Sequence, residues 1–250
     1  MRSFLSDGIE IAYDVFGEGR PVLMIHGFGS NSRVNWIDTG WVQAVTGAGY
    51  QAIVLDNRGH GRSQKLYDPA LYSSRLMAHD PINLLDHLHI GKAALIGYSM
   101  GARIAAFAAL DAPDRVAAAI IGGLGIRILE GLDTSAEIAA ALRAESLSSV
   151  KGRIGRQYRI FAEHTGSDLE VLAVCMEAGR SPFSTAMLAE LGQPILVAVG
   201  SKDDIAGPAE PLAARIDKGE ALVIDGRDHM RATGDKQFKA GALSFLGRVY

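Results

Sequence analysis

The sequence predicts an α/β fold in which one mostly parallel sheet carries helices on both faces. Two observations lead to this prediction. Short apolar runs rich in β-branched residues recur along the chain, and segments with the apolar spacing of helices separate them. With 250 residues, of which 48% are hydrophobic and 21% charged, the chain also has the composition of a globular protein built around one core.

The first two expected strands open the sheet as an antiparallel pair. One lies around Phe4 and the other spans residues 9–16, and the Asp7-Gly8 dipeptide between them favours a tight hairpin turn. Six further runs are apolar throughout, so we expect strands buried on both faces at 21–25, 51–55, 93–96, 116–121, 194–199 and 221–224. Together these runs predict an eight-stranded sheet.

Helices are expected among these strands at 35–47, 75–88, 100–110, 208–216 and 235–246. The stretch 126–191 breaks the alternation, because it is rich in Ala, Leu and Arg, has helical spacing and contains no convincing strand. We interpret 126–191 as a small helical cap inserted into one core domain, which residues 1–125 and 192–250 form.

Charge and composition argue against several classes of protein. The 25 basic and 28 acidic residues give a net charge of −3 without any basic run, so we expect no nucleic-acid partner. The first residues lack the features of a secretory signal, and the apolar runs are too short to cross a bilayer, which favours a cytoplasmic protein without a membrane partner. The single cysteine, Cys175, excludes an intrachain disulfide and a cysteine-based zinc site, and its helical surroundings predict an inert buried thiol.

A candidate nucleophile stands in the segment Gly97-Tyr98-Ser99-Met100-Gly101. An expected strand precedes this segment and an expected helix follows it, which is the setting of a nucleophile elbow. The glycines allow strand and helix to approach closely, and the first turn of the helix directs N–H groups toward developing negative charge. A serine in a turn can instead simply cap a helix, but the strand and helix around Ser99 favour the nucleophile.

The partners of such a serine are a base and an acid. Of the seven histidines, His229 is best placed as the base, because it follows the last expected strand through a short turn at the carboxyl edge of the sheet. A carboxylate that orients the imidazole is expected in a loop after another strand. Asp203 and Asp204 both stand in such a loop, and the residues alone do not separate them.

The oxyanion of an attacked carbonyl needs hydrogen-bond donors. The glycine-rich loop after the strand at 21–25 offers the Phe28 N–H, and the elbow offers the Met100 N–H, although a plain strand-to-loop turn is the alternative for the glycine loop. We expect Phe28 and Met100, together with Tyr98 and Trp36, to line an apolar substrate pocket.

Five segments in this order resemble the α/β-hydrolase superfamily: HGFG at 26–29, DNRGHGRS at 56–63, GYSMG at 97–101, GSKD at 200–203 and DH at 228–229. The resemblance spans nearly the whole chain outside the expected cap and implies an α/β-hydrolase fold. It favours Asp203 over Asp204 as the acid. It also implies a structural role for 56–63, which leaves Arg58 and His60 outside the site.

The expected function is hydrolysis of a carboxylester, lactone or thioester of a small apolar substrate. Ser99 would form an acyl-enzyme, His229 would act as general base and Asp203 would orient it, without metal or cofactor. A hydrolase of carbon–carbon bonds and a perhydrolase or haloperoxidase-like enzyme are alternatives on the same triad. A small-molecule receptor with vestigial hydrolysis is an alternative from another class, because a fold does not dictate function.

Five arginines of the expected cap, at positions 127, 143, 153, 156 and 159, could bind a substrate carboxylate. Their spacing equally suits an exposed helix face. We favour the exposed face, because long cationic side chains usually remain solvated.

Overall fold

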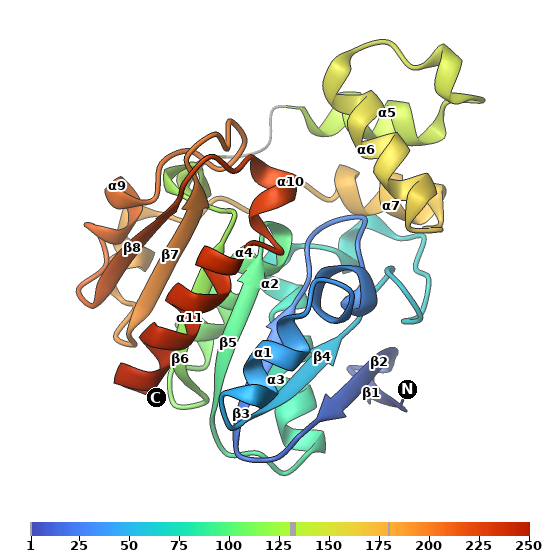
Figure 1. Ribbon diagram of the computed structural model, residues 1–250. Coiled ribbons are helices and arrows are strands. Elements are labelled where there is room, and N and C mark those ends of the chain that lie inside the picture. Colours follow the sequence, from blue (N-terminus) through green and yellow to red (C-terminus); the bar gives the residue numbers. More distant parts are fainter. Residues whose placement is uncertain (1, 131–133, 180) are drawn as a thin grey trace.

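The computed structural model describes residues 2–130, 134–179 and 181–250 (Figure 1). They form one eight-stranded sheet in the order β1-β2-β4-β3-β5-β6-β7-β8. The strands are β1 (Arg2–Ser6), β2 (Ile9–Phe16), β3 (Arg20–Ile25), β4 (Tyr50–Leu55), β5 (Ala93–Tyr98), β6 (Val116–Gly122), β7 (Ile195–Gly200) and β8 (Gly219–Ile224). The β1–β2 and β2–β4 pairs are antiparallel and the other pairs are parallel, which confirms the predicted mostly parallel sheet.

The opening hairpin forms where the sequence predicts it. Asp7 and Gly8 both have positive φ, 48° and 82°, as the tight hairpin turn that matches the twist of its strands requires. Ser6 is paired with Ile9 across this turn.

The prediction of strands buried on both faces is wrong for β8. This strand lies at the edge of the sheet, where only β7 pairs with it. Its residues are largely exposed, and Val223 keeps 44% of its surface in contact with solvent. An apolar run does not distinguish an edge strand from a central one.

Helices cover both faces of the sheet. The helices outside the stretch between β6 and β7 are α1 (Trp41–Gly47), α2 (Ser74–Met77), α3 (His79–His87), α4 (Met100–Asp111), α9 (Glu210–Ala213), α10 (His229–Ala232) and α11 (Lys236–Val249). In Figure 1, α1 and α11 lie in front of the sheet, while α3 and α4 pack behind it. Alternate residues of β3 serve the two cores, since Leu23 and Ile25 belong to one buried cluster and Val22 and Met24 to the other.

Two predicted helices are interrupted. The segment 35–47 consists of a short π-helical turn, η1 (Arg33–Ile37), and then α1, with Gly40 at φ 76° between them. The segment 75–88 is divided into α2 and α3. Pro81 gives a physical reason for this break, because a proline has no N–H to donate to the carbonyl four residues earlier.

The chain between β6 and β7 contains η3 (Ile126–Leu129), α5 (Ser135–Arg143), η4 (Leu147–Ser149), α6 (Arg153–His164), α7 (Leu169–Glu177) and α8 (Thr185–Ala189). Its described residues include no strand, while residues 131–133 and 180 of the predicted cap lie outside the described residues. Figure 1 shows α5, α6 and α7 beyond the carboxyl ends of the parallel strands. Cys175 is buried in α7. Across the described chain, no helix combines the length and the apolar character needed to span a bilayer.

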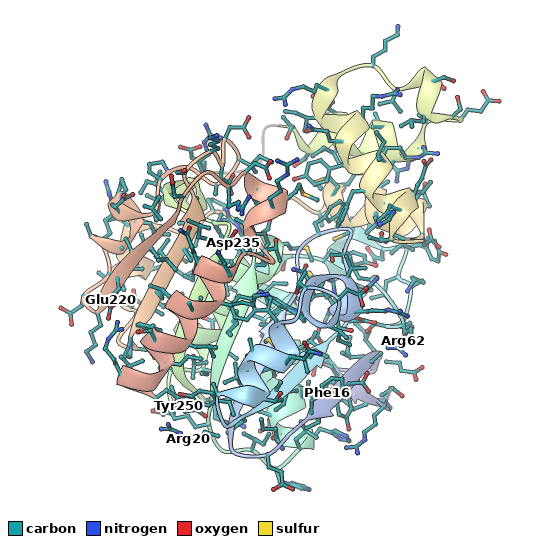
Figure 2. The ribbon with its side chains drawn as sticks, in the orientation of Figure 1. Phe16, Arg20, Arg62, Glu220, Asp235 and Tyr250 are labelled. Carbon is teal, nitrogen blue, oxygen red and sulfur yellow. The ribbon has the colours of Figure 1, made fainter. Side chains whose placement is uncertain are left out.

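Tyr250 packs at the amino end of β3, opposite the carboxyl ends of the parallel strands. Figure 2 labels Arg20 and Tyr250 close together there, and the Arg20 guanidinium carbon lies 5.1 Å from the centre of the Tyr250 ring. The Tyr250 hydroxyl donates a hydrogen bond of 2.9 Å to the Pro21 carbonyl. These contacts fix α11 against the start of β3, away from the carboxyl edge.

A buried ion pair joins the loop after β4 to α3. The Arg58 guanidinium donates to both carboxylate oxygens of Asp80, over 2.9 and 2.8 Å, and each side chain is only 1% exposed. Asp80 also accepts a hydrogen bond from the Ser6 hydroxyl at 2.6 Å. The structure thus gives Arg58 a structural role.

We predict that Asp80→Ala lowers the free energy of unfolding by about 3–5 kcal/mol, because it leaves the Arg58 charge buried without compensation. Asp86→Ala is the matched control. Asp86 pairs with Arg115 but is 61% exposed, so its removal is expected to cost less than about 1 kcal/mol. Urea unfolding measures both variants, and equal effects of the two would contradict the prediction.

Candidate active site

Ser99 occupies a strained turn between β5 and α4. Its φ is 54° and its ψ −111°, a conformation that residues other than glycine rarely adopt. The turn is tight because α4 begins directly against β3: a Cβ added to Gly101 would lie 2.0 Å from the Ile25 carbonyl oxygen. A Cβ on Gly97 would lie 2.2 Å from the Gly101 carbonyl oxygen. Only glycine fits at these two positions, and Ser99 is lifted to the carboxyl edge of the sheet.

His229 lies within hydrogen-bond distance of this serine. Its Nε2 is 3.1 Å from the Ser99 Oγ. The sequence places His229 in an open loop, but the structure makes it the first residue of the one-turn helix α10, which the Asp228 carboxylate caps by accepting the Arg231 N–H. The N-cap at Asp228 and the short helix restrict where the imidazole can point.

Asp203 supports the imidazole from the other side. Its Oδ2 is 2.8 Å from the His229 Nδ1, while its Oδ1 accepts the backbone N–H groups of Ile205 and Ala206 at 2.9 Å each. Because a carboxylate only accepts, the Nδ1 carries the proton and the Nε2 is left as an acceptor for the Ser99 hydroxyl. The Asp203 side chain is fully buried, whereas that of the neighbouring Asp204 is 75% exposed. Contacts thus separate the two aspartates in the sense that the resemblance to the family implies.

Tyr98 holds the base from beneath. Its hydroxyl donates a hydrogen bond to the backbone carbonyl of His229. Burial raises the pKa of Tyr98, which keeps this hydroxyl protonated and able to donate. The sequence places Tyr98 in a substrate pocket, but only 4% of the residue is exposed. In the structure its contact is with the backbone of the base.

The glycine loop after β3 lies beside the serine. A Cβ on Gly27 would be 3.5 Å from the Ser99 Cβ, and the Gly27 N–H donates to the buried Asn35 side chain at 3.1 Å. The elbow packs on the same end of β3, where a Cβ on Gly101 would lie 2.6 Å from the His26 carbonyl oxygen. This placement suits two oxyanion donors, and the assignment of these two N–H groups remains a prediction.

The loop after β4 braces the glycine loop. The Asn57 N–H donates to His26 Nε2, and the Asn57 side chain donates to the His26 carbonyl, both at 2.9 Å. The Asp56 carboxylate accepts the N–H of Ser32 at 2.7 Å and that of Arg62 at 2.9 Å. The segment 56–63 therefore supports the site without reaching it.

His26 and His60 form a neutral buried pair behind this loop. Both are fully buried, and their ring centres are 5.4 Å apart. Burial lowers the pKa of His26, and burial together with the charge of a protonated His26 lowers the pKa of His60 to about 3. The His60 ring meets Phe28 edge-on at 5.7 Å, so the pair sets the back wall of the loop that carries Phe28.

Ser99 opens into a cavity of about 330 Å³ below the segment between β6 and β7. Among the described residues, the walls combine apolar side chains with three arginines and two acids. The lining residues are Ser99, Arg103, Gly123, Leu124, Arg127, Glu130, Thr134, Arg153, Ile154, Gln157, Tyr158, Asp204, Ile205 and Ala206. A larger and more open hollow of about 640 Å³ lies on the far side of α10 and does not include Ser99. We take the smaller cavity as the candidate substrate site because it contains the serine.

The expected apolar lining needs correction at Trp36. This side chain is fully buried in the core in front of the sheet, where it meets Trp41 edge-on at 5.8 Å. The sequence shows that the tryptophan follows the glycine loop, but not that η1 turns its ring inward. Phe28 and Met100 are also mostly buried, at 6% and 4% exposure.

The five arginines of the expected cap have different environments. Arg159 is buried and donates to the carbonyls of Ala141, Leu142 and Ala144, so an exposed position is wrong for it. Arg143 is paired with Glu170 and Glu177. Arg156 lies on the exposed side of α6, and Arg127 and Arg153 line the cavity at Ser99.

Sequence reasoning missed Arg103 as part of the site. It lies on α4 one turn after the serine and donates to the carbonyls of Ile128, at 2.7 Å, and Ser181, at 2.9 Å. The guanidinium thus joins α4 to two separate parts of the segment above it. An arginine in the small apolar sequence of α4 is the feature that could have indicated this. Among the described residues, no three His, Cys, Asp or Glu side chains converge as metal ligands.

Comparisons with known proteins agree with the fold. A family described as the alpha/beta hydrolase fold matches residues 20–143. The chain is 41% identical over 95 residues to a non-heme chloroperoxidase of Kitasatospora aureofaciens, which covers 38% of this chain and 33% of that protein. It is 35% identical over 253 residues to the dihydrolipoyllysine-residue acetyltransferase component of an acetoin cleaving system of Pseudomonas putida, covering 94% of this chain and 65% of that one.

Solved structures extend the likeness to the whole fold. A thermophilic esterase from Thermogutta terrifontis superposes with a TM-score of 0.77 at 26% identity, covering 99% of this chain and 97% of the esterase. In the chloroperoxidase and in other locally matching relatives, the matched stretch spans about a third of the protein's length.

The buried His60 predicts a pH dependence of stability. In the unfolded chain His60 takes up a proton near pH 6.5, and in the folded chain it does so only near pH 3. The unfolded state therefore binds more protons between these values. The contribution of neutral His60 to the free energy of unfolding is therefore fully present above pH 6.5 and is lost as the pH drops toward 3. In His60→Asn this loss should be shallower, by up to about 1.4 kcal/mol per pH unit.

Urea unfolding between pH 7 and pH 4 measures the slope. His164→Gln, on the exposed side of α6, is the control and should keep the slope of the unmodified chain. Parallel slopes for His60→Asn and the unmodified chain would refute the neutral buried state of His60.

Proposed function

Because the chain belongs to the α/β-hydrolase superfamily, we propose that it is a serine hydrolase that cleaves an ester-like bond through an acyl-enzyme intermediate. Ser99 is the nucleophile, His229 the general base and Asp203 the acid that orients the base. One observation carries the proposal: an unbroken chain of contacts runs from the Ser99 Oγ through the imidazole to the buried Asp203, over 3.1 and 2.8 Å.

The chemistry follows from this chain of contacts. As the Ser99 oxygen attacks the acyl carbon, its proton passes to His229 Nε2, and the cationic imidazole is stabilised by Asp203. The negative charge on the former carbonyl oxygen is held by the N–H groups of Phe28 and Met100. The imidazolium then protonates the leaving oxygen. A water molecule activated by the same imidazole releases the acid and restores the serine.

The segment 126–191 acts as a cap over a core formed by 1–125 and 192–250. Support for this division comes from η3 and α6, whose residues Arg127, Arg153 and Tyr158 line the cavity above Ser99. A cavity of about 330 Å³ suits a small substrate. Its mixed lining favours a substrate with polar groups over the purely apolar one that the sequence suggests.

Removing the nucleophile tests the proposal. With 4-nitrophenyl acetate, Ser99→Ala is expected to lower kcat by about 10⁴-fold or more, because no other side chain can form the acyl-enzyme. Circular dichroism of the variant confirms that it is folded. Hydrolysis by folded Ser99→Ala at the rate of the unmodified chain would refute the proposal.

The two neighbouring aspartates provide a matched pair of variants. Asp203→Asn is expected to lower kcat by about 10⁴-fold, because an amide no longer selects the tautomer with a proton on Nδ1. Asp204→Asn should lower it less than about tenfold, since this exposed side chain does not touch the imidazole. Equal losses would show that the contact between Asp203 and His229 is not the one that matters.

A further inference from the structure

The cavity at Ser99 carries an unusual concentration of guanidinium groups. Arg127 comes from η3, Arg153 from the first turn of α6, and Arg103 lies beneath them on α4. Among the described residues of the lining, two are acidic, Glu130 and Asp204. The described part of the wall around the serine is therefore net cationic, although the chain as a whole is net negative.

The acids lie near the two outer arginines without closing hydrogen bonds to them. The Arg153 Nη2 is 3.7 Å from the Asp204 carboxylate, and the Arg127 Nε is 3.8 Å from the Glu130 carboxylate. Both distances exceed the range of a charge-assisted hydrogen bond, about 2.7–2.9 Å. A guanidinium has five N–H donors in a planar fork, so each arginine retains the capacity to bind a second carboxylate.

The two outer arginines differ in how firmly they are placed. Arg127 Nη1 donates to the carbonyls of Asp204 and Ile205, which fixes its position on the loop that carries Asp203. The side chain of Arg153 lines the cavity and is 73% exposed. Arg153 is therefore the residue whose removal disturbs the triad least.

We infer that this cavity selects esters that carry a carboxylate, which Arg153 and Arg127 bind while the ester carbonyl lies at Ser99. The inference rests on the proposed function and adds the substrate class to it. The negative group belongs either to the acyl part or to the alcohol part of the ester, since both parts meet at the serine.

Matched pairs of esters separate these two sources. For the acyl side, the mono-4-nitrophenyl ester of adipic acid is compared with the same ester in which the far carboxylate is a carboxamide. For the alcohol side, 4-acetoxybenzoate is compared with 4-acetoxybenzamide. Within each pair the shape is kept and only the charge changes, so a difference in kcat/KM reports recognition of the carboxylate.

At least one carboxylate ester should exceed its amide partner in kcat/KM by about tenfold to a hundredfold, the effect expected of a charged hydrogen bond. Arg153→Gln should remove most of this preference by slowing the carboxylate ester much more than the amide. Arg156→Gln, on the same helix but outside the cavity, is the matched control and should retain the preference. Raising the salt concentration to 0.5 M should reduce it.

Two results would overturn the inference. One is equal kcat/KM within both ester pairs, and the other is an equal loss for both members of a pair in Arg153→Gln. Failure of the proposed function is visible separately, as an absence of turnover with every ester, including 4-nitrophenyl acetate.

In that case binding alone decides the inference. Calorimetric titration of folded Ser99→Ala with adipate monomethyl ester should show tighter binding than with its carboxamide, and Arg153→Gln in the same background should abolish the difference. Equal binding of the two compounds would overturn the inference.

Discussion

The close approach of the nucleophile helix to the central strands is the constraint on which the rest of the site depends. Because α4 begins against the ends of β3 and β5, Gly97 and Gly101 have no space for a side chain, and the chain between them turns through one residue with a positive φ. That residue is Ser99, whose backbone strain is balanced by a fully buried strand before it and a largely buried helix after it. The same contact brings the glycine loop and the first N–H groups of α4 to the serine. The packing of the core therefore fixes the positions of Ser99 and of the backbone around it.

Much of this arrangement could be predicted from the sequence, because it depends on local patterns. Apolar runs locate all eight strands, and glycines at fixed positions around Ser99 indicate the elbow. The errors arise where long-range packing decides. The run that forms β8 does not reveal that it lies at an edge, and the residues around His229 do not show that Asp228 caps a turn of helix there. The resemblance to the family favours Asp203 over Asp204, but the physical reason appears only in three dimensions, since one is buried against the imidazole and the other faces solvent.

The segment above the sheet illustrates the limit of periodicity most clearly. The sequence pattern does not distinguish its arginines, yet Arg159 is buried against backbone carbonyls, Arg143 binds two glutamates, and Arg153 lines the cavity. Helical spacing assigns a residue to a face but does not tell which element will cover that face. The polarity of the cavity therefore depends on how η3, α6 and the loop after β7 come together around Ser99.

The central claim is that the strained serine of the elbow is the nucleophile. It is tested most directly by reaction with a fluorophosphonate, digestion with trypsin and mass spectrometry. Trypsin releases the peptide spanning residues 93–103, in which Ser99 is the single serine. The account predicts that the phosphonyl adduct lies on Ser99 of this peptide, and fragmentation distinguishes it from Tyr98. An adduct on another residue, with Ser99 left unmodified in protein that has lost its activity, would contradict the account.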